Sequence, residues 1–414
     1  MKIQDLIIRF PHLPENIFQK LGSESLFKIR EVTRCWQNII DGRNYPWLCI
    51  VNIPTILKER NSYLHLAAKT GQIEGFKTAL NQEEDKNIKN ELGQTSFHLA
   101  CVNCRPKIVN LLMKSTDFEI DFNATEKRQR TAFHLACQEG HLDVVQLFIE
   151  NASTLNTDLN AKHDHMGLSA FILACERGHS DVVKIIVENA ADLSIDLNAK
   201  DKYGISGFLF VCNQDSTDLV KIFMENASKL GIDLNAKTNK ALNNRTGFHQ
   251  ACAQGCLNVV KVLMENAATL EIALNAKDIN DRTGFHHACE QGYANIVKIF
   301  MANAADLCID LDREDNKGMT AFHLACQSGH SDVIKLFMEN ATVLNIDLNR
   351  KNDNNLTPYH LACYIGQSKS DVVKIFMENA ASLSINLNIF HGLTYLITRL
   401  FTKVLRDSKS LDCT

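Results

Sequence analysis

The chain of 414 residues has no apolar run of the roughly 18 residues that a helix needs to span a bilayer. It has no strong charge of either sign, because 44 basic residues face 48 acidic ones and the pI is near 6.4. Its first ten residues mix charges with apolar positions and lack a small-residue cleavage site. We therefore expect no membrane and no nucleic acid as partner, and a soluble, intracellular protein of the cytoplasm or nucleus.

The sequence also lacks a glycine-rich phosphate loop and a singular nucleophile. Nucleophilic catalysis would need one unusual Cys or Ser beside a base and an orienting partner. Most of the 14 cysteines instead recur once per copy of a repeated segment, inside apolar stretches. We therefore expect buried, reduced thiols, no cofactor and no catalytic activity.

One segment, Phe-His-Leu-Ala-Cys or a variant of it, recurs along the chain. Its last residue stands at Ala68, Cys101, Cys137, Cys175, Cys212, Cys252, Cys289, Cys326 and Cys363. The successive separations are 33, 36, 38, 37, 40, 37, 37 and 37 residues. Such regular spacing predicts about nine copies of one supersecondary unit.

The copy spanning Asp315–Asn349 shows the expected unit. Thr320 can cap a first helix, and Gly329 ends it. A second helix follows, with apolar residues at helical spacing from Val333 onward and charged residues facing water. An extended segment, called a finger from here on, then leads to the next first helix. Because one helix pair cannot bury its apolar stripes alone, neighbouring copies must stack, which predicts an all-α solenoid.

These residues resemble the ankyrin repeat family. The family pattern Gly-x-Thr-Pro-Leu-His-x-Ala-Ala is matched by Gly318-Met319-Thr320-Ala321-Phe322-His323-Leu324-Ala325-Cys326, and its Gly-His-x-x-Val-Val by 140–145. The resemblance covers about Asn61–Asn388 and implies a protein-binding groove lined by first helices and fingers. Residues 389–414 are predicted to start another copy but supply only one helix, which would cap the end of the array.

Most copies exceed the family length of 33 residues by about four, which is one helical turn. In the segment from Glu188 to Asn198, the added Leu193 continues the apolar stripe, so we expect a second helix that is one turn longer. The copy with Phe208–Cys212 departs furthest from the pattern. It has Leu209 in place of the motif histidine and Asp215 in place of the glycine, which predicts a local irregularity.

Residues 1–50 differ from the array and contain three short apolar stripes at helical spacing. Their order resembles the F-box over roughly Phe10–Leu48. The resemblance implies binding to a Skp-family linker of a cullin-RING ubiquitin ligase through Leu13, Pro14, Ile17, Leu21, Leu26, Val32 and Trp36. Residues 51–60 contain no glycine- or serine-rich spacer and predict a short, stiff junction to the repeats at 61–388.

Side chains without a packing role are expected at finger tips and at the ends of the first helices. These candidate groove residues are His163, His165, Glu176, Arg177, Lys202, Tyr203, Lys240, Gln254, Asn280, Arg282, Glu290, Gln291, Tyr364 and Ile365. Several fingers carry a basic residue, such as Lys200, Lys237 or Arg350, which favours an acidic or mixed-charge protein partner.

Two alternatives to these assignments follow from the sequence. The recurring pairs His134/Cys137 and His323/Cys326 raise the possibility of a metal site, but a structural zinc site needs four converging ligands. Core packing is the simpler interpretation of these pairs. The second alternative is a repeat scaffold without a ligase role, in which the first 50 residues only cap the stack. Under the ligase interpretation, the chain is expected to be a monomer apart from the ligase complex.

Overall fold

The computed structural model describes residues 62–388, apart from gaps at 84, 116–117, 164–165 and 366–369. The predicted F-box-like module (1–50), junction (51–60) and terminal cap (389–414) lie outside the described residues. The chain divides into two compact units, one ending at Asp164 and the other starting at His165. Both units are built from the same helix pair.

Each copy contributes a first helix and a second helix, joined by a tight turn. The first helices are α5 (Tyr63–Thr70), α7 (Ser96–Val102), α9 (Ala132–Glu139), α11 (Ala170–Arg177), α13 (Gly207–Cys212), α15 (Gly247–Gln254), α17 (Gly284–Gln291), α19 (Ala321–Ser328) and α21 (Pro358–Ile365). The second helices are α6 (Ile73–Gln82), α8 (Pro106–Lys114), α10 (Leu142–Leu155), α12 (Ser180–Glu188), α14 (Thr217–Leu230), α16 (Leu257–Glu265), α18 (Ala294–Asn303), α20 (Ser331–Leu344) and α22 (Ser370–Asn379). The fingers contain only the strands β1 (Lys162–His163) and β2 (Leu168–Ser169) and the 3₁₀ turn η2 (Lys240–Leu242) as regular elements among the described residues.

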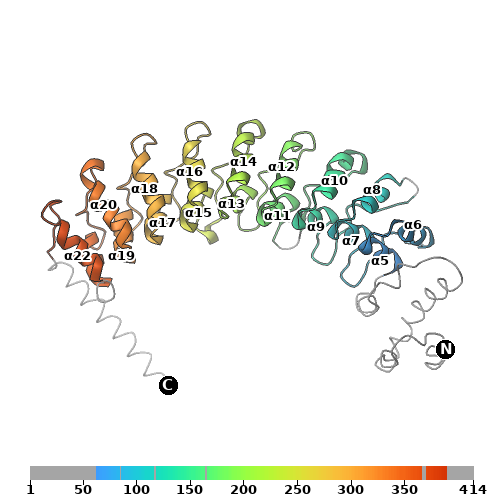
Figure 1. Ribbon diagram of the computed structural model, residues 1–414, viewed down its shortest axis with the longest axis horizontal. Coiled ribbons are helices and arrows are strands. Elements are labelled where there is room, and N and C mark those ends of the chain that lie inside the picture. Colours follow the sequence, from blue (N-terminus) through green and yellow to red (C-terminus); the bar gives the residue numbers. More distant parts are fainter. Residues whose placement is uncertain (1–61, 84, 116–117, 164–165, 366–369, 389–414) are drawn as a thin grey trace, which may run out of the picture. The chain divides into compact units, whose positions relative to one another are not determined.

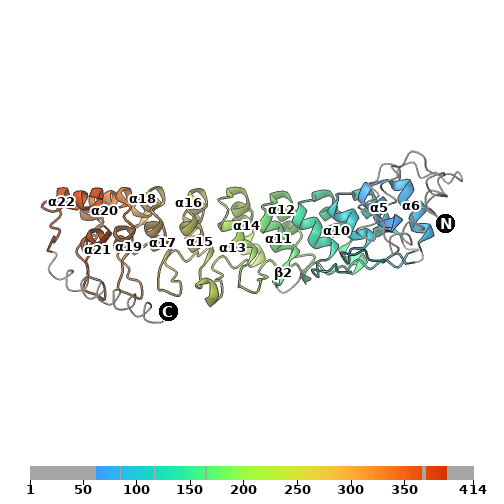
Figure 2. The same ribbon diagram turned by 90° about the horizontal axis from the view of Figure 1, so that it is seen from below.

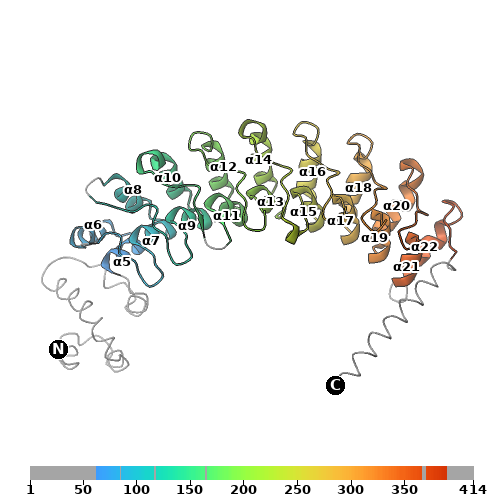
Figure 3. The same ribbon diagram turned by 180° about the vertical axis from the view of Figure 1, so that it is seen from behind.

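Within each unit the helices form two layers. In the second unit, first helices pack on first helices from α11 to α21, and second helices pack on second helices from α12 to α22. Figures 1 and 3 show these layers from opposite sides, and Figure 2 shows the fingers of this unit projecting to one side of them. The arrangement confirms the predicted all-α solenoid.

The first helices begin and end as the sequence predicts. The hydroxyl of Thr320 accepts a hydrogen bond from the His323 amide, and the His323 Nδ1 accepts one from the Thr320 amide at 3.1 Å. Gly329 then ends α19 with a left-handed φ of 71°. The same Thr and His pairing starts α7, α9, α15 and α17. Local sequence therefore sets the position of each first helix.

The core is a row of phenylalanine rings shared between neighbouring copies. Phe337 of α20 lies 4.6 Å from Phe322 of its own copy and 5.9 Å from Phe285 of the preceding copy, measured between ring centroids. Phe300 of α18 bridges Phe285 and Phe248 in the same way. Because each second-helix ring contacts two first helices, no copy completes its core alone.

The second helices only partly follow the predicted lengthening. Helices α10, α14 and α20 run for 14 residues, and their left-handed C-cap residues are Asn156, Gly231 and Asn345. The prediction is wrong for 188–198, because α12 stops at Glu188 and continues as turns. A left-handed residue follows the second helix in each of these copies. In the copy with α12, that residue is Ser194 and comes after the turns. Asn and Gly tolerate left-handed backbone best, which accounts for the clean helix ends where they occur.

The expected irregularity at Asp215 is compensated by its side chain. Asp215 has a left-handed φ of 50°, and the glycines at this position in other copies, such as Gly178 with φ 75°, are also left-handed. Its carboxylate accepts hydrogen bonds from the amides of Asn258 and Val259 at 3.1 and 3.3 Å, at the start of α16. The N-cap residue of α16, Cys256, makes no side-chain cap of its own. Asp215, which departs from the motif, therefore caps the start of α16 in the next copy.

Histidines of α5, α7, α15, α17 and α19 form hydrogen bonds to the finger that follows. The Nε2 of His249 lies 3.0 Å from the carbonyl oxygen of Arg282, and His323 Nε2 lies 3.2 Å from that of Leu356. Since the Nδ1 atoms accept from backbone amides, the Nε2 atoms carry the proton that is donated to these carbonyls. Burial keeps these rings neutral and lowers the pKa values of both to about 4.

We expect acid to destabilise the array because of these histidines. Burial lowers the pKa of His98, His249, His286 and His323 to about 4, from 6.5 for an exposed ring. Below pH 6.5 the unfolded chain binds protons that the folded chain does not, so stability is complete above that pH and falls toward pH 4. Each ring contributes at most about 1.4 kcal/mol per pH unit in this window.

Thermal unfolding followed by circular dichroism between about pH 7.5 and pH 4.5 tests this expectation. The midpoint should fall with pH, and His323→Leu should flatten the dependence, since Leu209 already occupies the equivalent position in another copy. A midpoint that is unchanged over this range in the native chain would contradict the assignment of neutral, buried rings.

Candidate protein-binding surface

The fingers are shaped by one acceptor side chain at the start of each tip. The Oδ1 atom of Asp201 accepts hydrogen bonds from the amides of Tyr203 and Ile205 at 2.8 and 2.7 Å. Asp278 and Asp315 make the equivalent pair of bonds in later fingers. These bonds fold each tip tightly, and they leave the tip side chains on the surface.

Neighbouring fingers are joined to each other through their backbones. The amide of Asn239 donates to the carbonyl of Tyr203 at 2.8 Å, and the amide of Ile279 donates to that of Asn243 at 2.9 Å. The close approach requires Gly204, whose φ is 78° and where a Cβ atom would lie 2.8 Å from the Asn239 nitrogen. Successive tips in the second unit therefore form one continuous strip.

A ladder of asparagines joins the bases of the fingers. Asn198 donates to the carbonyl of Gly231 at 2.8 Å and accepts from the amide of Asp233 at 2.8 Å. Equivalent pairs of bonds are made by Asn87, Asn123, Asn235, Asn275 and Asn349. At the equivalent position Asp312 accepts from the Asp347 amide, but a carboxylate has no proton to donate. At Asp312 the ladder therefore has the hydrogen bond that the side chain accepts but not the one that an asparagine would donate.

The candidate groove residues differ in exposure. The exposed ones are Arg177, Lys202, Lys240, Gln254, Gln291 and Tyr364. The half-buried ones are Glu176, Tyr203, Asn280, Arg282 and Glu290. His165 lies outside the described residues, and Ile365 is the last residue of α21. Exposed and half-buried polar side chains thus stand on the fingers and first-helix ends of the second unit.

One candidate residue is not on the surface. His163 is buried with 6% of its area exposed, and its ring meets that of His134 edge-on at 5.5 Å. The expectation of an exposed finger-tip histidine is therefore wrong. The alternation of side chains in β1, where Lys162 is exposed and the next residue is buried, accounts for the difference.

Arg282 and Glu290 are bound to each other rather than available to a partner. Arg282 Nη1 lies 2.9 Å from a Glu290 oxygen, and its Nε lies 3.1 Å from the buried carboxylate of Asp315. His287, where most copies have leucine, bonds Asp278 at 3.0 Å. Burial opposes ionisation of Asp278, but the bonds from His287 and from two backbone amides hold its pKa at about 2. This cluster fixes the finger 276–283 on α17.

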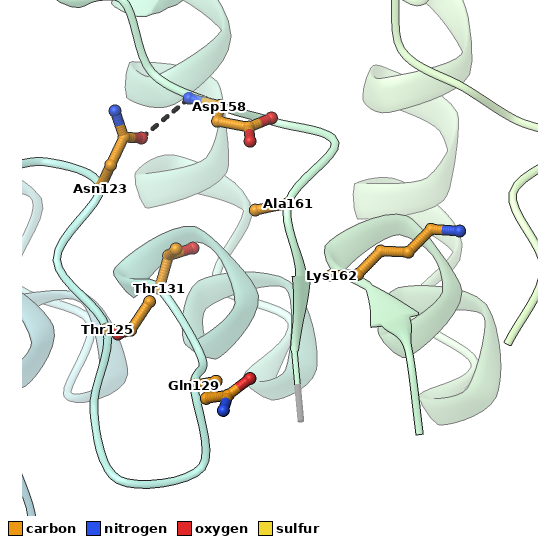
Figure 4. A pocket seen from close by; sticks show the side chains of 7 residues that line it. All are labelled: Asn123, Thr125, Gln129, Thr131, Asp158, Ala161 and Lys162. Atoms are coloured by element: carbon orange, nitrogen blue, oxygen red, sulfur yellow. Dashed lines mark hydrogen bonds between the residues drawn. The ribbon is translucent and has the colours of Figure 1, made fainter. Parts of the chain in front are cut away.

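A shallow hollow of about 430 Å³ lies between two fingers of the first unit. Figure 4 shows its lining, where Asn123 accepts the bond from the Asp158 amide at 2.8 Å. The remaining lining residues are Thr125, Gln129, Thr131, Ala161 and Lys162. The lining thus consists mainly of amide, hydroxyl and charged side chains, which can form hydrogen bonds with a protein surface.

The recurring His and Cys residues have structural roles in the described part of the chain. The ring nitrogens of His249, His286 and His323 hydrogen-bond to backbone or hydroxyl groups of the first helix and the next finger. Burial raises the pKa of the Cys175 and Cys326 thiols, which makes them poor nucleophiles. No group of three or more metal-ligating side chains occurs among the residues that the structure describes. Within the same residues, no helix combines the length and apolarity needed to cross a membrane.

Comparison with known families agrees with this geometry. A model described as ankyrin repeats (3 copies) matches residues 46–126, 118–201 and 285–389, and one described as ankyrin repeats (many copies) matches 248–300. The chain belongs to the ankyrin repeat family. Ankyrin repeats indicate a role in protein–protein interaction, and proteins of this family are typically non-enzymatic scaffolds.

The ankyrin repeats also resemble a solved structure, the crystal structure of the ankyrin repeat domain of Bcl-3, described as a unique member of the IkappaB protein family. The identity is 22% and the TM-score 0.47, over 55% of this chain and 93% of that chain. Among curated proteins, none matches this chain.

Sequence reasoning missed two features of the ankyrin surface. The asparagine ladder is visible in the sequence as the recurring Asp-Leu-Asn at 158–160, 196–198, 233–235 and 347–349, but its bonds to the next copy need three-dimensional contacts. The pairing of Arg282 with Glu290 spans eight residues, and both were expected to face a partner. Arg282 lies in the finger before α17, so the spacing of residues within a helix does not predict this contact.

We expect Asp312→Asn to stabilise the array. The new amide can donate to the carbonyl of Asn345, as Asn123 does to Asn156 in an earlier copy, for a gain of about 1 kcal/mol. The matched variant Asn235→Asp should cost a similar amount, because it removes the donor to Glu271. Chemical denaturation measures the change in the free energy of unfolding for both variants. Changes of the same sign in the two variants would contradict a stabilising role of the asparagine ladder.

We expect Arg282→Gln to act on stability rather than on partner binding alone. The change leaves the buried carboxylate of Asp315 without its cation, at a cost of about 2–4 kcal/mol. The control Arg177→Gln removes an exposed arginine at a first-helix end and should stay within about 0.5 kcal/mol. Denaturation midpoints compare the two, and equal small effects would show that the ion pairs are not structural.

Proposed function

We propose that this protein is a substrate receptor of a cullin-RING ubiquitin ligase. In this proposal its ankyrin repeats hold a protein substrate, and the F-box-like residues at 1–50 hold a Skp-family linker. The observation that carries the substrate-holding role is the strip of joined fingers, whose tips have side chains free of core packing, such as Lys202 and Lys240. The protein contributes recognition, and the transfer chemistry belongs to its partners.

The ligase role is supported by the order of residues before the repeats. Leu13-Pro14, Leu26 and Trp36 keep the order and approximate spacing of an F-box, and they precede a recognition array. A stretch of 50 residues is small for an independent core, and a docked linker would cover its remaining apolar side chains. A ligase of this kind would act in the cytoplasm or nucleus.

A rigid connection between the two modules would give such a receptor a fixed working distance. The junction at 51–60 contains Ile53-Pro54 and no flexible spacer, so it is expected to be stiff. In the complex the substrate would then be held at a set position relative to the linker. The substrate groove would be formed by the exposed and half-buried candidate residues, and the chain would be a monomer apart from the ligase.

We expect the double variant Leu13→Ala/Pro14→Ala to abolish capture of a purified Skp-family linker by the full chain. The two residues begin the first predicted helix of the linker-binding module, so their loss removes contacts without touching the repeats. A pull-down measures capture, and circular dichroism should show unchanged helical content.

A scaffold without a ligase role gives a different result in the same assays. If residues 1–50 only cap the stack, the native chain captures no linker, and the double variant lowers the thermal midpoint of the repeats. This outcome would remove the ligase role and leave the protein-binding role of the repeats in place.

A further inference from the structure

Two neighbouring fingers of the second unit are held differently from the others. They are finger A, residues 199–206, and finger B, residues 236–246. After α5, α7, α15, α17 and α19 a histidine Nε2 donates to the finger that follows, as His249 does to Arg282 at 3.0 Å. The residues at that position before fingers A and B are Ile172 and Leu209, which cannot donate a hydrogen bond. Fingers A and B thus lack the histidine contact to a first helix.

Finger B is also longer than its neighbours. The separation of Cys212 and Cys252 is 40 residues instead of the usual 37, and the longer tip contains the 3₁₀ turn η2. Thr238 replaces the aspartate that shapes fingers such as A. Its hydroxyl accepts from the Arg245 amide and donates to the carbonyl of Leu242, both at 2.9 Å. The insertion therefore enlarges the tip, and the threonine removes a negative charge from it.

Fingers A and B together carry an excess of positive charge. Their cations are Lys200, Lys202, Lys237, Lys240 and Arg245, and their one acid is Asp201, which is 8% exposed. All four lysines are exposed, and Arg245 Nε lies 3.9 Å from the carboxylate of Asp278 in the next finger. On a chain with a net charge of −4, this local excess favours an acidic ligand.

Backbone contacts bring the lysine-bearing tips of fingers A and B next to each other. Lys202 Nζ lies 4.9 Å from the centroid of the Tyr203 ring. Asn239 of finger B bonds the carbonyls of both residues, at 3.0 and 2.8 Å, and thereby places Lys240 beside them. The contact between fingers thus brings two exposed lysines and a tyrosine into one patch.

Partly exposed apolar side chains stand on the elements next to fingers A and B. Phe210 stands on α13 where other first helices have Leu173, Gln250 or Leu324, and it is half-buried. It packs with Met166 against a small core that includes Ala199 at the start of finger A. On the other side, Ile279 is 43% exposed and its amide bonds finger B. The A–B patch, defined as Lys202, Tyr203, Phe210, Lys240 and Ile279, is therefore both basic and apolar.

The geometry points to the A–B patch as the docking centre for an acidic peptide segment that carries an aromatic or aliphatic anchor residue. This inference rests on the proposed role of the repeats in holding a protein. Carboxylates of the peptide meet Lys202 and Lys240, and its anchor packs against Phe210 or Ile279. Because fingers A and B lack the histidine contact, their tips can adjust to the peptide without breaking a bond from a histidine of the preceding first helix.

A random peptide library displayed on phage and selected on the full chain tests this inference. Enriched peptides should contain an excess of Asp and Glu around an aromatic or aliphatic residue. A synthetic copy of an enriched peptide should bind about tenfold or more weakly to Lys202→Glu/Lys240→Glu, and its binding should weaken with added salt. Phe210→Gln, which installs the residue found at the equivalent position 250, should also weaken binding while the chain stays folded.

The matched control is Lys184→Glu/Lys221→Glu, which makes the same change in charge at exposed positions of α12 and α14. This variant should bind the peptide as the native chain does. Equal weakening by both double variants, enrichment of peptides without acidic excess, or no enrichment would overturn the inference. So would binding of a single-stranded oligonucleotide, rather than any peptide, to the same lysines. Capture of the Skp-family linker is measured separately on the same protein preparations. If the chain captures no linker, the peptide-binding result still tests the A–B patch.

Discussion

The structure depends on the burial of each copy's apolar side chains against the next copy. Phe337 shows this dependence, because its ring is fully buried only between Phe322 of its own copy and Phe285 of the neighbour. A single helix pair would leave such rings in water, so stability is a property of adjacent copies rather than of any one copy. The hydrogen bonds from the His323 ring and from the asparagine ladder follow the same rule, since both join one copy to the next.

Stacking in this way leaves the fingers free to vary. Helix positions are committed to packing, while the tips need only one acceptor residue, such as Asp201 or Thr238, to keep their shape. The remaining tip residues can therefore be chosen for a partner. Their alignment by backbone bonds such as Asn239 to Tyr203 turns separate loops into one surface. Helices that serve packing and tips that are free to vary favour a role in protein recognition. The match to the ankyrin family agrees with this role.

Much of the fold could be predicted from the sequence because its determinants are local and repeated. Thr320, His323 and Gly329 mark the start and end of a helix in one short stretch, and the 37-residue period shows that the stretch is copied. The candidate surface was predicted less well. Exposure of His163 and the pairing of Arg282 with Asp315 depend on contacts between copies, which a single sequence does not reveal. The same holds for the length of α12, which depends on how a left-handed residue ends each helix.

Hydrogen–deuterium exchange on Phe337→Ala tests the central claim most directly. If neighbouring copies share one core, protection should fall in α19 and α20 and also in α17 of the preceding copy, whose Phe285 loses its contact. Protection in α5 to α8 should stay as in the native chain, because those helices lie several copies away. Loss of protection confined to α19 and α20 would contradict the account, because it would show that each copy is stable without its neighbour.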